Sequence, residues 1–288
     1  MNSMPDSPSR LDKLLPLLAC PACRAALYQD ADDLLCRGCG TRFVIKEGRP
    51  VFWPNADTVK VMPPEHLSNE VPRFVVDWLT WLDGMVLNVG AGGTHLKLDN
   101  CIEMESCIFR HTDVVGDAHH LPFSDAVFDA VITFNTFEHL HDPKRAASEI
   151  YRVLKPGGKL ILYTAFLQPV HEAPYHFYNT TEYGLRRWFD AFTITKVEVS
   201  ENFSPAYVLG WLASELLSAV EATQGPEAAR QLADTSLAFW RSTWANKAER
   251  AHPAWQRLGR LPQEIQKRVS AGFHLEAIKP EETGRAAA

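Results

Sequence analysis

Four cysteines near the start of the chain constrain its fold more than any other feature. They form two C-x-x-C pairs, Cys20 with Cys23 and Cys36 with Cys39, and twelve residues separate the pairs. Two pairs at this spacing deliver four thiolates to the corners of a tetrahedron, which is the geometry that zinc prefers. A segment of about fifty residues has too little core to fold without such a staple. We therefore predict a small zinc-binding domain, with these four cysteines as the metal ligands.

Disulfides or a redox-active pair are the other common uses of such cysteines. No apolar run approaches the roughly 18–20 residues of a membrane span, and the short apolar stretch 14–18 lacks the basic leader of a signal peptide. We therefore expect a cytoplasmic chain, which disfavours disulfides, while two matched pairs disfavour a redox site. Because the four thiols leave no open position on the metal, the expected zinc is structural.

The net charge of the chain argues against a partner that is held through its phosphates. The 288 residues include 29 lysines and arginines against 35 aspartates and glutamates, a formal net charge of −6. Binding to nucleic acid needs a local surplus of cations. The hydrophobic share of 46% is ordinary for a globular protein with a sizeable core.

The residues around the cysteine pairs have a known likeness. The run LLPLLACPAC at residues 14–23 and the run VIKEGRPV at residues 44–51 resemble the short zinc-ribbon proteins that act as activating subunits of tRNA and protein methyltransferases. Here the ribbon is fused to a larger domain. The likeness is informative only if the rest of the chain resembles a methyltransferase.

Beyond the ribbon, apolar strands alternate with helical segments. An amphipathic helix is expected at 68–82, and a helix that starts at Asp142 and Pro143 is expected to end near Lys155. The expected strands lie at 85–89, 112–115, 128–134, 159–165 and 192–199. This alternation predicts an α/β fold with a mostly parallel sheet, whose ligands bind at the carboxyl ends of its strands.

The glycine-rich turn after the first of these strands needs companions before it can be interpreted. A dinucleotide-binding fingerprint would place a third glycine at position 95, where the chain has His95, so that fingerprint fails. The later motifs GDAHHLPF at 116–123 and RVLKPGG at 152–158 resemble the class I S-adenosylmethionine-dependent methyltransferases of the type 11 kind. The resemblance covers residues 84–200. It implies a Rossmann-like, seven-stranded, mostly parallel sheet that ends in an antiparallel pair.

The same resemblance implies S-adenosylmethionine as the cofactor and assigns residues to it. Glycines let the backbone approach the cofactor where a Cβ would collide. Glu105, with Glu103 as the alternative, would bind the ribose hydroxyls. Asp117 would accept from the adenine amino group beside the backbone N–H of Ala118, and Asn135 would lie at the methionine end. The full set of cofactor-binding residues expected is Asn88, Gly90, Gly92, Gly93, Glu105, Asp117, Ala118 and Asn135.

Three features depart from the family pattern. Asn88 stands where an acidic residue is usual, and Thr94 stands where a third glycine is common. The connections 90–101 and 105–112 are short for parallel crossovers, which usually need about a dozen residues. We therefore expect the first two helices of the sheet to be reduced or absent. This keeps open a non-catalytic scaffold that binds the cofactor.

The aromatic loop at 166–178 is the expected acceptor side. It carries His171 and His176, and a neutral histidine is a suitable base near pH 7. The alternative is that these rings only pack the loop. We name His171 first and His176 second as candidate catalytic residues.

The domain boundaries follow from these patterns. The expected parts are a zinc ribbon at 1–55, a linker and amphipathic helix at 56–83, the methyltransferase core at 84–204, a helical insertion at 205–270, a last core strand at 271–280 and a disordered tail at 281–288. The insertion would cap the substrate or form a homodimer. The favoured function is methyl transfer to an oxygen or nitrogen of a small molecule or glycan. A ribosomal or transfer RNA methyltransferase with a zinc-binding domain is the alternative.

Overall fold

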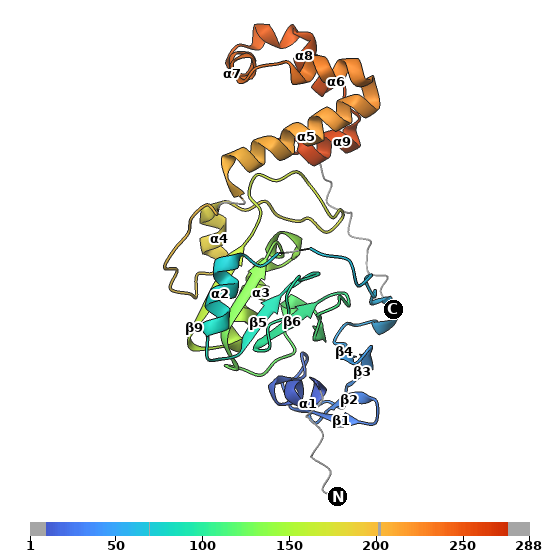
Figure 1. Ribbon diagram of the computed structural model, residues 1–288, viewed down its shortest axis with the longest axis vertical. Helices are drawn as coiled ribbons and strands as arrows, with labels where there is room; N and C mark the ends of the chain where they lie inside the picture. The colour runs from blue at the N-terminus through green and yellow to red at the C-terminus, as the bar shows by residue number, and fades with distance from the viewer. Residues whose placement is uncertain (1–9, 69, 201–202, 276–288) are drawn as a thin grey trace, which may run out of the picture. The chain divides into compact units, whose positions relative to one another are not determined.

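The computed structural model describes residues 10–68, 70–200 and 203–275 (Figure 1). It divides into two compact units. The first comprises residues 1–166 and 172–198, and the second comprises residues 167–171 and 199–288. The first unit contains the cysteine pairs and a parallel sheet, and the second is helical. Among the described residues, no helix combines the length and apolar character needed to cross a bilayer.

The ribbon follows the short helix α1 (Arg10–Leu14) and is a four-stranded antiparallel sheet. Its strands β1 (Leu27–Asp30), β2 (Asp33–Cys36), β3 (Arg42–Lys46) and β4 (Arg49–Pro50) pair in chain order. Residues 31–32 form the turn between β1 and β2, where Ala31 has a positive φ of 53°. The two cysteine pairs therefore lie on turns at one end of this sheet, because Cys36 ends β2 and pairs with Leu27.

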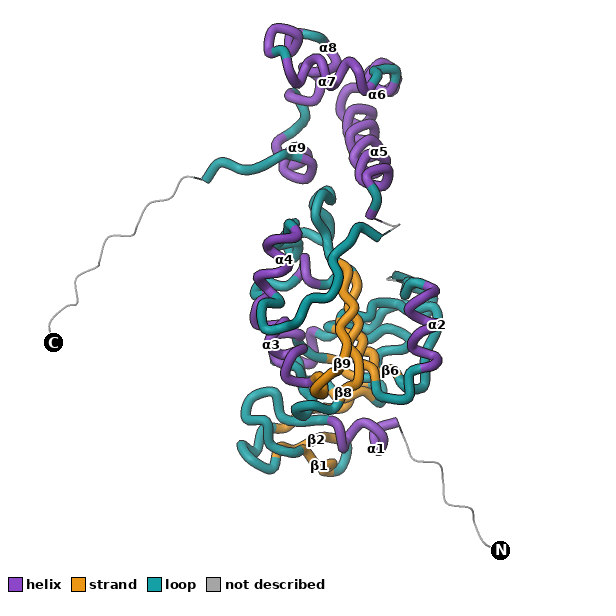
Figure 2. Tube along the Cα trace, turned by 90° about the vertical axis from the view of Figure 1, so that its left-hand side faces the viewer, coloured by secondary structure: helices purple, strands orange, loops and turns teal. Residues whose placement is uncertain are grey.

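The second sheet of the first unit is five-stranded, with all pairs parallel. Its strands β5 (Val86–Val89), β6 (Cys101–Glu105), β7 (Val114–Val115), β8 (Phe128–Phe134) and β9 (Leu154–Tyr163) are arranged in the order β7-β6-β5-β8-β9. Figure 2 shows α2 (Arg73–Trp81) on one face of this sheet, and α3 (Pro143–Val153) and α4 (Glu182–Trp188) on the other. The order reverses at β5, and the carboxyl edge beside β5 is where α/β sheets bind ligands.

The start of α3 illustrates how the sequence sets these elements. The Asp142 carboxylate accepts a hydrogen bond from the Arg145 N–H at 3.0 Å, and Pro143 occupies the first turn. Ala146, Ile150 and Val153 are buried against the sheet. This crossover helix joins β8 to β9, whereas residues 90–100 and 106–113 connect β5, β6 and β7 without any helix.

The prediction of a seven-stranded sheet is wrong for the described chain, whose parallel sheet has five strands. The segment expected as a strand at 192–199 is irregular, and so are residues 272–275 of the expected last strand. A strand exists only where a neighbour supplies the hydrogen bonds, and these two segments were expected to pair as the antiparallel end of the sheet. Without that pair neither becomes a strand. Residues 276–280 and the expected tail 281–288 lie outside the described residues.

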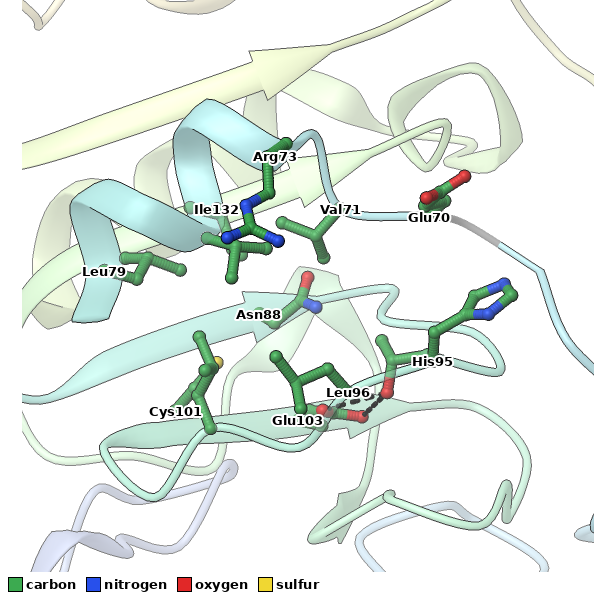
Figure 3. Close-up of a pocket in the computed structure, with 13 residues that line it drawn as sticks. Glu70, Val71, Arg73, Leu79, Asn88, His95, Leu96, Cys101, Glu103 and Ile132 are labelled. Atoms are coloured by element: carbon green, nitrogen blue, oxygen red, sulfur yellow. Dashed lines mark hydrogen bonds between the residues drawn. The ribbon is translucent and has the colours of Figure 1, made fainter.

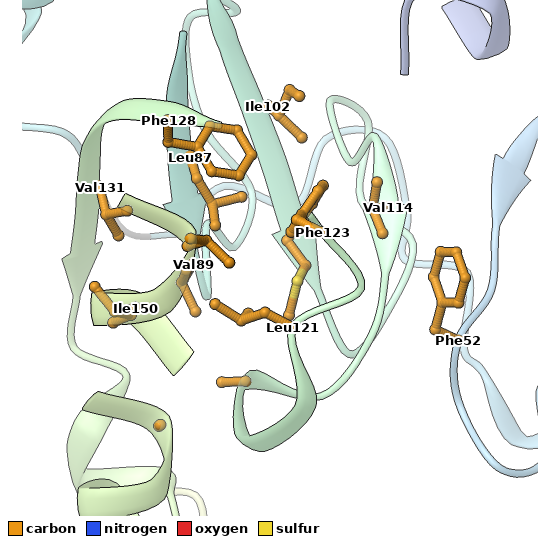
Figure 4. Close-up of a cluster of buried hydrophobic side chains, with 14 of the residues drawn as sticks. Phe52, Leu87, Val89, Ile102, Val114, Leu121, Phe123, Phe128, Val131 and Ile150 are labelled. Carbon is orange, nitrogen blue, oxygen red and sulfur yellow. The ribbon is translucent and has the colours of Figure 1, made fainter. Parts of the chain in front are cut away.

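One hydrophobic cluster joins the ribbon to the parallel sheet. Figure 4 shows part of it, from Phe52 beside the ribbon to Ile150 on α3. Leu18 forms an isolated antiparallel bridge with Phe123, and Val51 forms a parallel bridge with Val115. The ribbon and the sheet therefore share a core rather than meeting at a polar surface.

The second unit is built from helices. They are α5 (Pro205–Gln224), α6 (Pro226–Ala233), α7 (Leu237–Ala245), α8 (Pro253–Gly259) and α9 (Gln263–Val269). Ser204 caps α5 through a hydrogen bond from the Tyr207 N–H, and Gly225 ends it with a positive φ of 90°. Val220, Leu232 and Leu261 are buried in a separate cluster.

Candidate functional site

The four cysteines of the ribbon converge on one point. The Sγ atoms of Cys20 and Cys39 are 3.7 Å apart, those of Cys23 and Cys36 are 3.3 Å apart, and all four sulfurs lie within 4.8 Å of one another. Zn–S bonds of about 2.3 Å place the sulfurs of a tetrahedral site about 3.8 Å apart. Gly38 and Cys39 donate backbone N–H groups to the Cys36 sulfur at 3.3 and 3.4 Å. The donor set and its spacing fit a zinc ion.

The second candidate site is the carboxyl edge of the parallel sheet. Glu105 ends β6, and its Oε1 accepts a hydrogen bond from the Gly92 N–H at 3.0 Å while its Oε2 accepts one from the Ser106 N–H at 2.7 Å. Burial raises the pKa of Glu105, and these hydrogen bonds oppose the increase. The carboxylate therefore holds the glycine-rich turn after β5 against the end of β6.

The glycines of this turn are required by the chain's own packing. Gly90 has a φ of 66°, and a Cβ at this position would lie 2.2 Å from the Thr136 Oγ1. A Cβ on Gly93 would lie 2.2 Å from the His66 carbonyl oxygen. These glycines therefore allow close approach of the segments that follow β8 and precede α2. They are not by themselves an argument for a cofactor.

Asp117 follows β7 at the same edge and is held by a histidine. Its Oδ1 accepts hydrogen bonds from the His119 N–H at 2.9 Å and from the His119 Nδ1 at 2.5 Å. Burial acts to raise the pKa of Asp117, but the hydrogen bonds from His119 outweigh it and lower the pKa to about 2. His119 in turn accepts a hydrogen bond from the Asp142 N–H through Nε2 at 3.1 Å. Asp117 is therefore fixed and charged, and Ala118 beside it is buried.

Asn135 lies one residue past the end of β8. It has a positive φ of 52°, which asparagine tolerates better than most residues. Its backbone N–H donates to the Tyr163 carbonyl at 3.1 Å at the end of β9. The ends of β5, β6, β7 and β8 thus bring Gly90, Glu105, Asp117 and Asn135 to one edge, because parallel strands end together.

Asn88 and Glu103 lie within the sheet, on the face that α2 covers (Figure 3). Both are buried, with 3% and 2% of their surfaces exposed. The Glu103 carboxylate lies 2.9 and 3.0 Å from the Thr94 Oγ1. Burial raises the pKa of Glu103 to about 7. The cofactor contact expected for Asn88 stays a prediction, and Glu105 rather than Glu103 is the carboxylate at the edge.

The two histidines named as candidate bases belong to different units. His176 is in the first unit, where its ring centroid is 5.6 Å from that of His139, just past β8. The His139 Nδ1 lies 3.0 Å from the Tyr175 carbonyl oxygen. His171 is in the second unit, with its ring centroid 5.4 Å from that of Trp211.

The predicted site residues include neither His119, which holds Asp117 at the carboxyl edge, nor Thr94, which contacts Glu103. The first had a signal, because an aspartate commonly accepts hydrogen bonds from the residue two positions later. The second had none, since Thr94 and Glu103 meet only after β5 and β6 pair.

Two family models match the chain. Residues 90–162 match the methyltransferase domain, and residues 12–48 match the Trm112p-like protein family. The chain therefore carries a methyltransferase domain. In front of this domain it carries a Trm112p-like zinc ribbon, so both resemblances found in the sequence are confirmed.

Individual relatives are similar over part of the chain. A demethylmenaquinone methyltransferase of Thermobifida fusca (strain YX) is 49% identical over 51 residues, which are 18% of this chain and 22% of that protein. A demethylmenaquinone methyltransferase of Paenarthrobacter aurescens (strain TC1) is 37% identical over 153 residues, which are 47% of this chain and 57% of that protein. The chain thus matches less than two thirds of the length of either relative.

Solved structures match part of the chain. One is a complex between the Haloferax volcanii Trm112 methyltransferase activator and a methyltransferase, which is 18% identical and has a TM-score of 0.30. The match covers 44% of this chain and 74% of that chain.

Proposed function

We propose that the protein is an S-adenosylmethionine-dependent methyltransferase that methylates an oxygen or nitrogen of a small molecule or glycan. The observation that carries the proposal is the pair of carboxylates at the carboxyl edge. Glu105 and Asp117 end or follow neighbouring strands there, and the pKa of about 2 at Asp117 keeps that residue charged. Carboxylates accept hydrogen bonds strongly, which suits ribose hydroxyls and an adenine amino group.

The cofactor would lie along this edge, held by this chain's own groups. Glu105 would bind the ribose hydroxyls, Asp117 the adenine amino group, and Asn135 the methionine end. When bound, the cofactor supplies a methyl group that its sulfonium already activates. Alignment of the acceptor therefore provides most of the acceleration.

His176 is our first candidate for a base, ahead of His171. It belongs to the same unit as the carboxyl edge and packs against His139, which lies five residues past the end of β8. An acceptor that must lose a proton needs such a base within hydrogen-bond reach. We expect His176→Ala to lower turnover at least about tenfold with little change in cofactor affinity.

Titration calorimetry of the full chain with S-adenosylmethionine and S-adenosylhomocysteine tests the proposal. We expect roughly micromolar binding, which Asp117→Asn and Glu105→Gln each weaken at least about tenfold. Glu182→Gln on the exposed side of α4 is the matched control and should keep full affinity, because among the described residues Glu182 pairs only with Arg186 on its own helix. Binding of both compounds without turnover on any acceptor would favour the non-catalytic scaffold, and absence of binding to both would overturn the proposal.

Acceptors should be screened as small molecules before RNA. The relatives named above are quinone-pathway methyltransferases by name, which supports a small-molecule acceptor. The Trm112p-like domain supports the RNA alternative. Activity that falls steeply with salt would favour RNA, because phosphate contacts are salt-dependent, and flat salt dependence would favour a small molecule.

We also propose that the four ribbon cysteines hold one structural zinc ion. Four thiolates leave no position for a substrate, so the metal organises the ribbon and takes no part in methyl transfer. Metal analysis of the purified chain should give about one zinc per chain. Cys20→Ser should lower this value, and Cys107→Ser outside the ribbon should not.

A further inference from the structure

The face of the sheet beneath α2 contains a cavity whose lining includes none of Glu105, Asp117 and Asn135. Its volume is about 180 Å³. Leu79 on α2, Cys101 on β6 and Ile132 on β8 form apolar walls, and Asn88, Thr94 and Glu103 supply polar groups. The connection 90–100 contains no helix. The space that a crossover helix would fill is therefore bordered by a loop.

The amide of Asn88 is the first sign that this cavity takes a ligand. Asn88 is 97% buried, since 3% of its surface is exposed. Figure 3 shows its side chain pointing into the space between α2 and Glu103. Within the described residues, its side-chain amide makes no hydrogen bond to another part of the chain. The amide is not one of the fully enclosed polar atoms that lack a partner, so its polar atoms are accessible from the cavity, where a ligand would meet them.

Glu103 is the second sign. Both of its carboxylate oxygens lie within 3.0 Å of the single hydroxyl of Thr94. One hydroxyl proton satisfies one acceptor, so the carboxyl group keeps hydrogen-bonding capacity toward the cavity. Burial that raises the pKa of Glu103 to about 7 means that this group is partly protonated near neutral pH.

The basic side chains beside the cavity are paired with carboxylates of the chain, which favours a neutral ligand in its interior. Asp113 accepts a hydrogen bond from Lys97 and forms an ion pair with Arg10, and Lys97 lies 3.9 Å from Glu103. Arg73 at the rim pairs with Asp77 at 2.8 Å. Glu70 also lines the cavity, and its carboxylate is exposed. Deeper in the apolar space, between Leu79 and Ile132, an ammonium or carboxylate ligand would have no free counter-charge, which is strongly unfavourable.

We propose that this cavity binds a small neutral molecule with an apolar body and a carboxamide head. The body would lie against Leu79 and Ile132, and the head would pair with Asn88 and Glu103. A carboxamide both donates and accepts, so it matches the amide of Asn88 in a cyclic pair of hydrogen bonds. Apolar cavities of about 150 Å³ hold one benzene molecule, so a single ring fits the volume.

Benzamide is the probe for the full-length protein, and toluene, benzoate and benzylamine are its matched controls. Ligand-observed NMR should give benzamide an affinity at least about tenfold higher than each control. Equal affinity for benzamide and toluene would show that Asn88 and Glu103 do not recognise the carboxamide, which would overturn the proposal. Tighter binding of benzoate or benzylamine would show that the ligand is not neutral and would overturn it as well.

Two kinds of variant separate recognition from volume. Asn88→Leu should abolish the preference for benzamide over toluene while toluene still binds. Ile132→Phe fills the cavity and should remove binding of both, with Val76→Phe on α2 as a second filling variant if the first does not fold. Benzamide binding at the parent level in a folded, filled variant would contradict the proposal.

A competition experiment keeps this site apart from the carboxyl edge. Saturating S-adenosylmethionine should leave benzamide affinity unchanged within about twofold. Displacement of benzamide would place the cavity within the cofactor site and overturn the inference. If S-adenosylmethionine does not bind, the proposed function fails while the benzamide comparison still decides this proposal.

Discussion

The ribbon and the helical second unit are both additions to the parallel sheet, yet they are stabilised in different ways. The ribbon shares one hydrophobic cluster with the sheet, in which Leu18 and Phe52 join Phe123. The helices bury Val220 and Leu232 in a cluster of their own. A charged contact also crosses from the ribbon, where Arg24 binds Glu149 of α3 at 2.7 Å.

The size of an added segment therefore does not decide whether it unfolds separately from the sheet. The ribbon is the smaller addition, but its core is continuous with the sheet, so its stability and that of the sheet are linked. The second unit has its own core and is expected to unfold on its own. Four changes to the chain test this contrast, from the largest expected effect to the smallest.

Removal of the ribbon metal is the most severe test. Chelation, or Cys20→Ser with Cys39→Ser, should unfold the ribbon and lower the melting temperature of the sheet with it, because structural zinc contributes on the order of 10 kcal/mol. Calorimetry with and without chelator measures both transitions. Cys107→Ser is the control. A sheet transition that does not move would show that the ribbon and sheet are independent.

Breaking the ion pair between ribbon and sheet should cost about 4 kcal/mol. Glu149 accepts hydrogen bonds from Arg24, from Arg152 at 2.8 Å and from the Leu121 N–H at 2.9 Å. Glu149→Ala therefore leaves the partly buried Arg24 without its counter-charge, while Arg152 keeps its ion pair with Asp125. Urea unfolding monitored by circular dichroism gives the value.

The control for this change is Arg42→Ala in the same ribbon. Arg42 is half exposed and pairs with Asp30 and Asp33 on the ribbon surface, where solvent screens the charges, so its loss should destabilise the chain far less than Glu149→Ala. Similar losses for the two variants would argue that no strong contact crosses from ribbon to sheet.

Leu232→Ala tests the other half of the contrast. Leu232 is 6% exposed within the helical cluster, and its truncation should cost about 3 kcal/mol. The loss should appear in the helical transition alone, which hydrogen exchange resolves by segment. Leu237→Ala on the exposed side of α7 is the matched control. Faster exchange in β5 or β8 would mean that the units unfold together.

The pH dependence of stability is the smallest expected effect. Burial raises the pKa of Glu103 from 4.5 to about 7, so between these values the folded chain keeps a proton that the unfolded chain has released. The free energy of unfolding therefore falls by about 2 kcal/mol as the pH rises from about 5 to 7. Above pH 7 it changes little. Glu103→Gln should remove this slope in urea titrations at pH 5, 6 and 7.

Two results would contradict Glu103 as the cause of this pH dependence. An unchanged slope in Glu103→Gln would mean that Glu103 does not titrate in this range. A slope that also disappears in Glu182→Gln would exclude a buried group as the cause, because Glu182 is on the exposed surface of α4.

The sequence predicts the local elements well and the sheet edge poorly. Cysteine spacing predicts the ribbon, and the short connections predict crossovers without helices, because both depend on residues close in sequence. The strand expected at 192–199 has suitable residues but no neighbour to pair with. Whether this segment becomes a strand depends on pairing with a segment about seventy residues later, and a local sequence pattern cannot predict that pairing.

The candidate site shows the same limit. Motif order identifies Glu105 and Asp117, which end or follow strands. The cofactor contact that it assigns to Asn88 stays a prediction, and no local pattern reports that this side chain points toward α2. Sequence spacing cannot say which unit a loop residue joins, so His171 and His176 are five positions apart yet belong to different units.

The bridge between Leu18 and Phe123 affects how the protein is made. The ribbon leaves the ribosome first, but the chain it packs against is completed about a hundred residues later, on the order of ten seconds at ordinary translation rates. During that interval the apolar side of the ribbon is exposed to water, and the zinc ion proposed for its four thiols would hold it folded. Zinc supply during synthesis would then limit the yield of the whole chain.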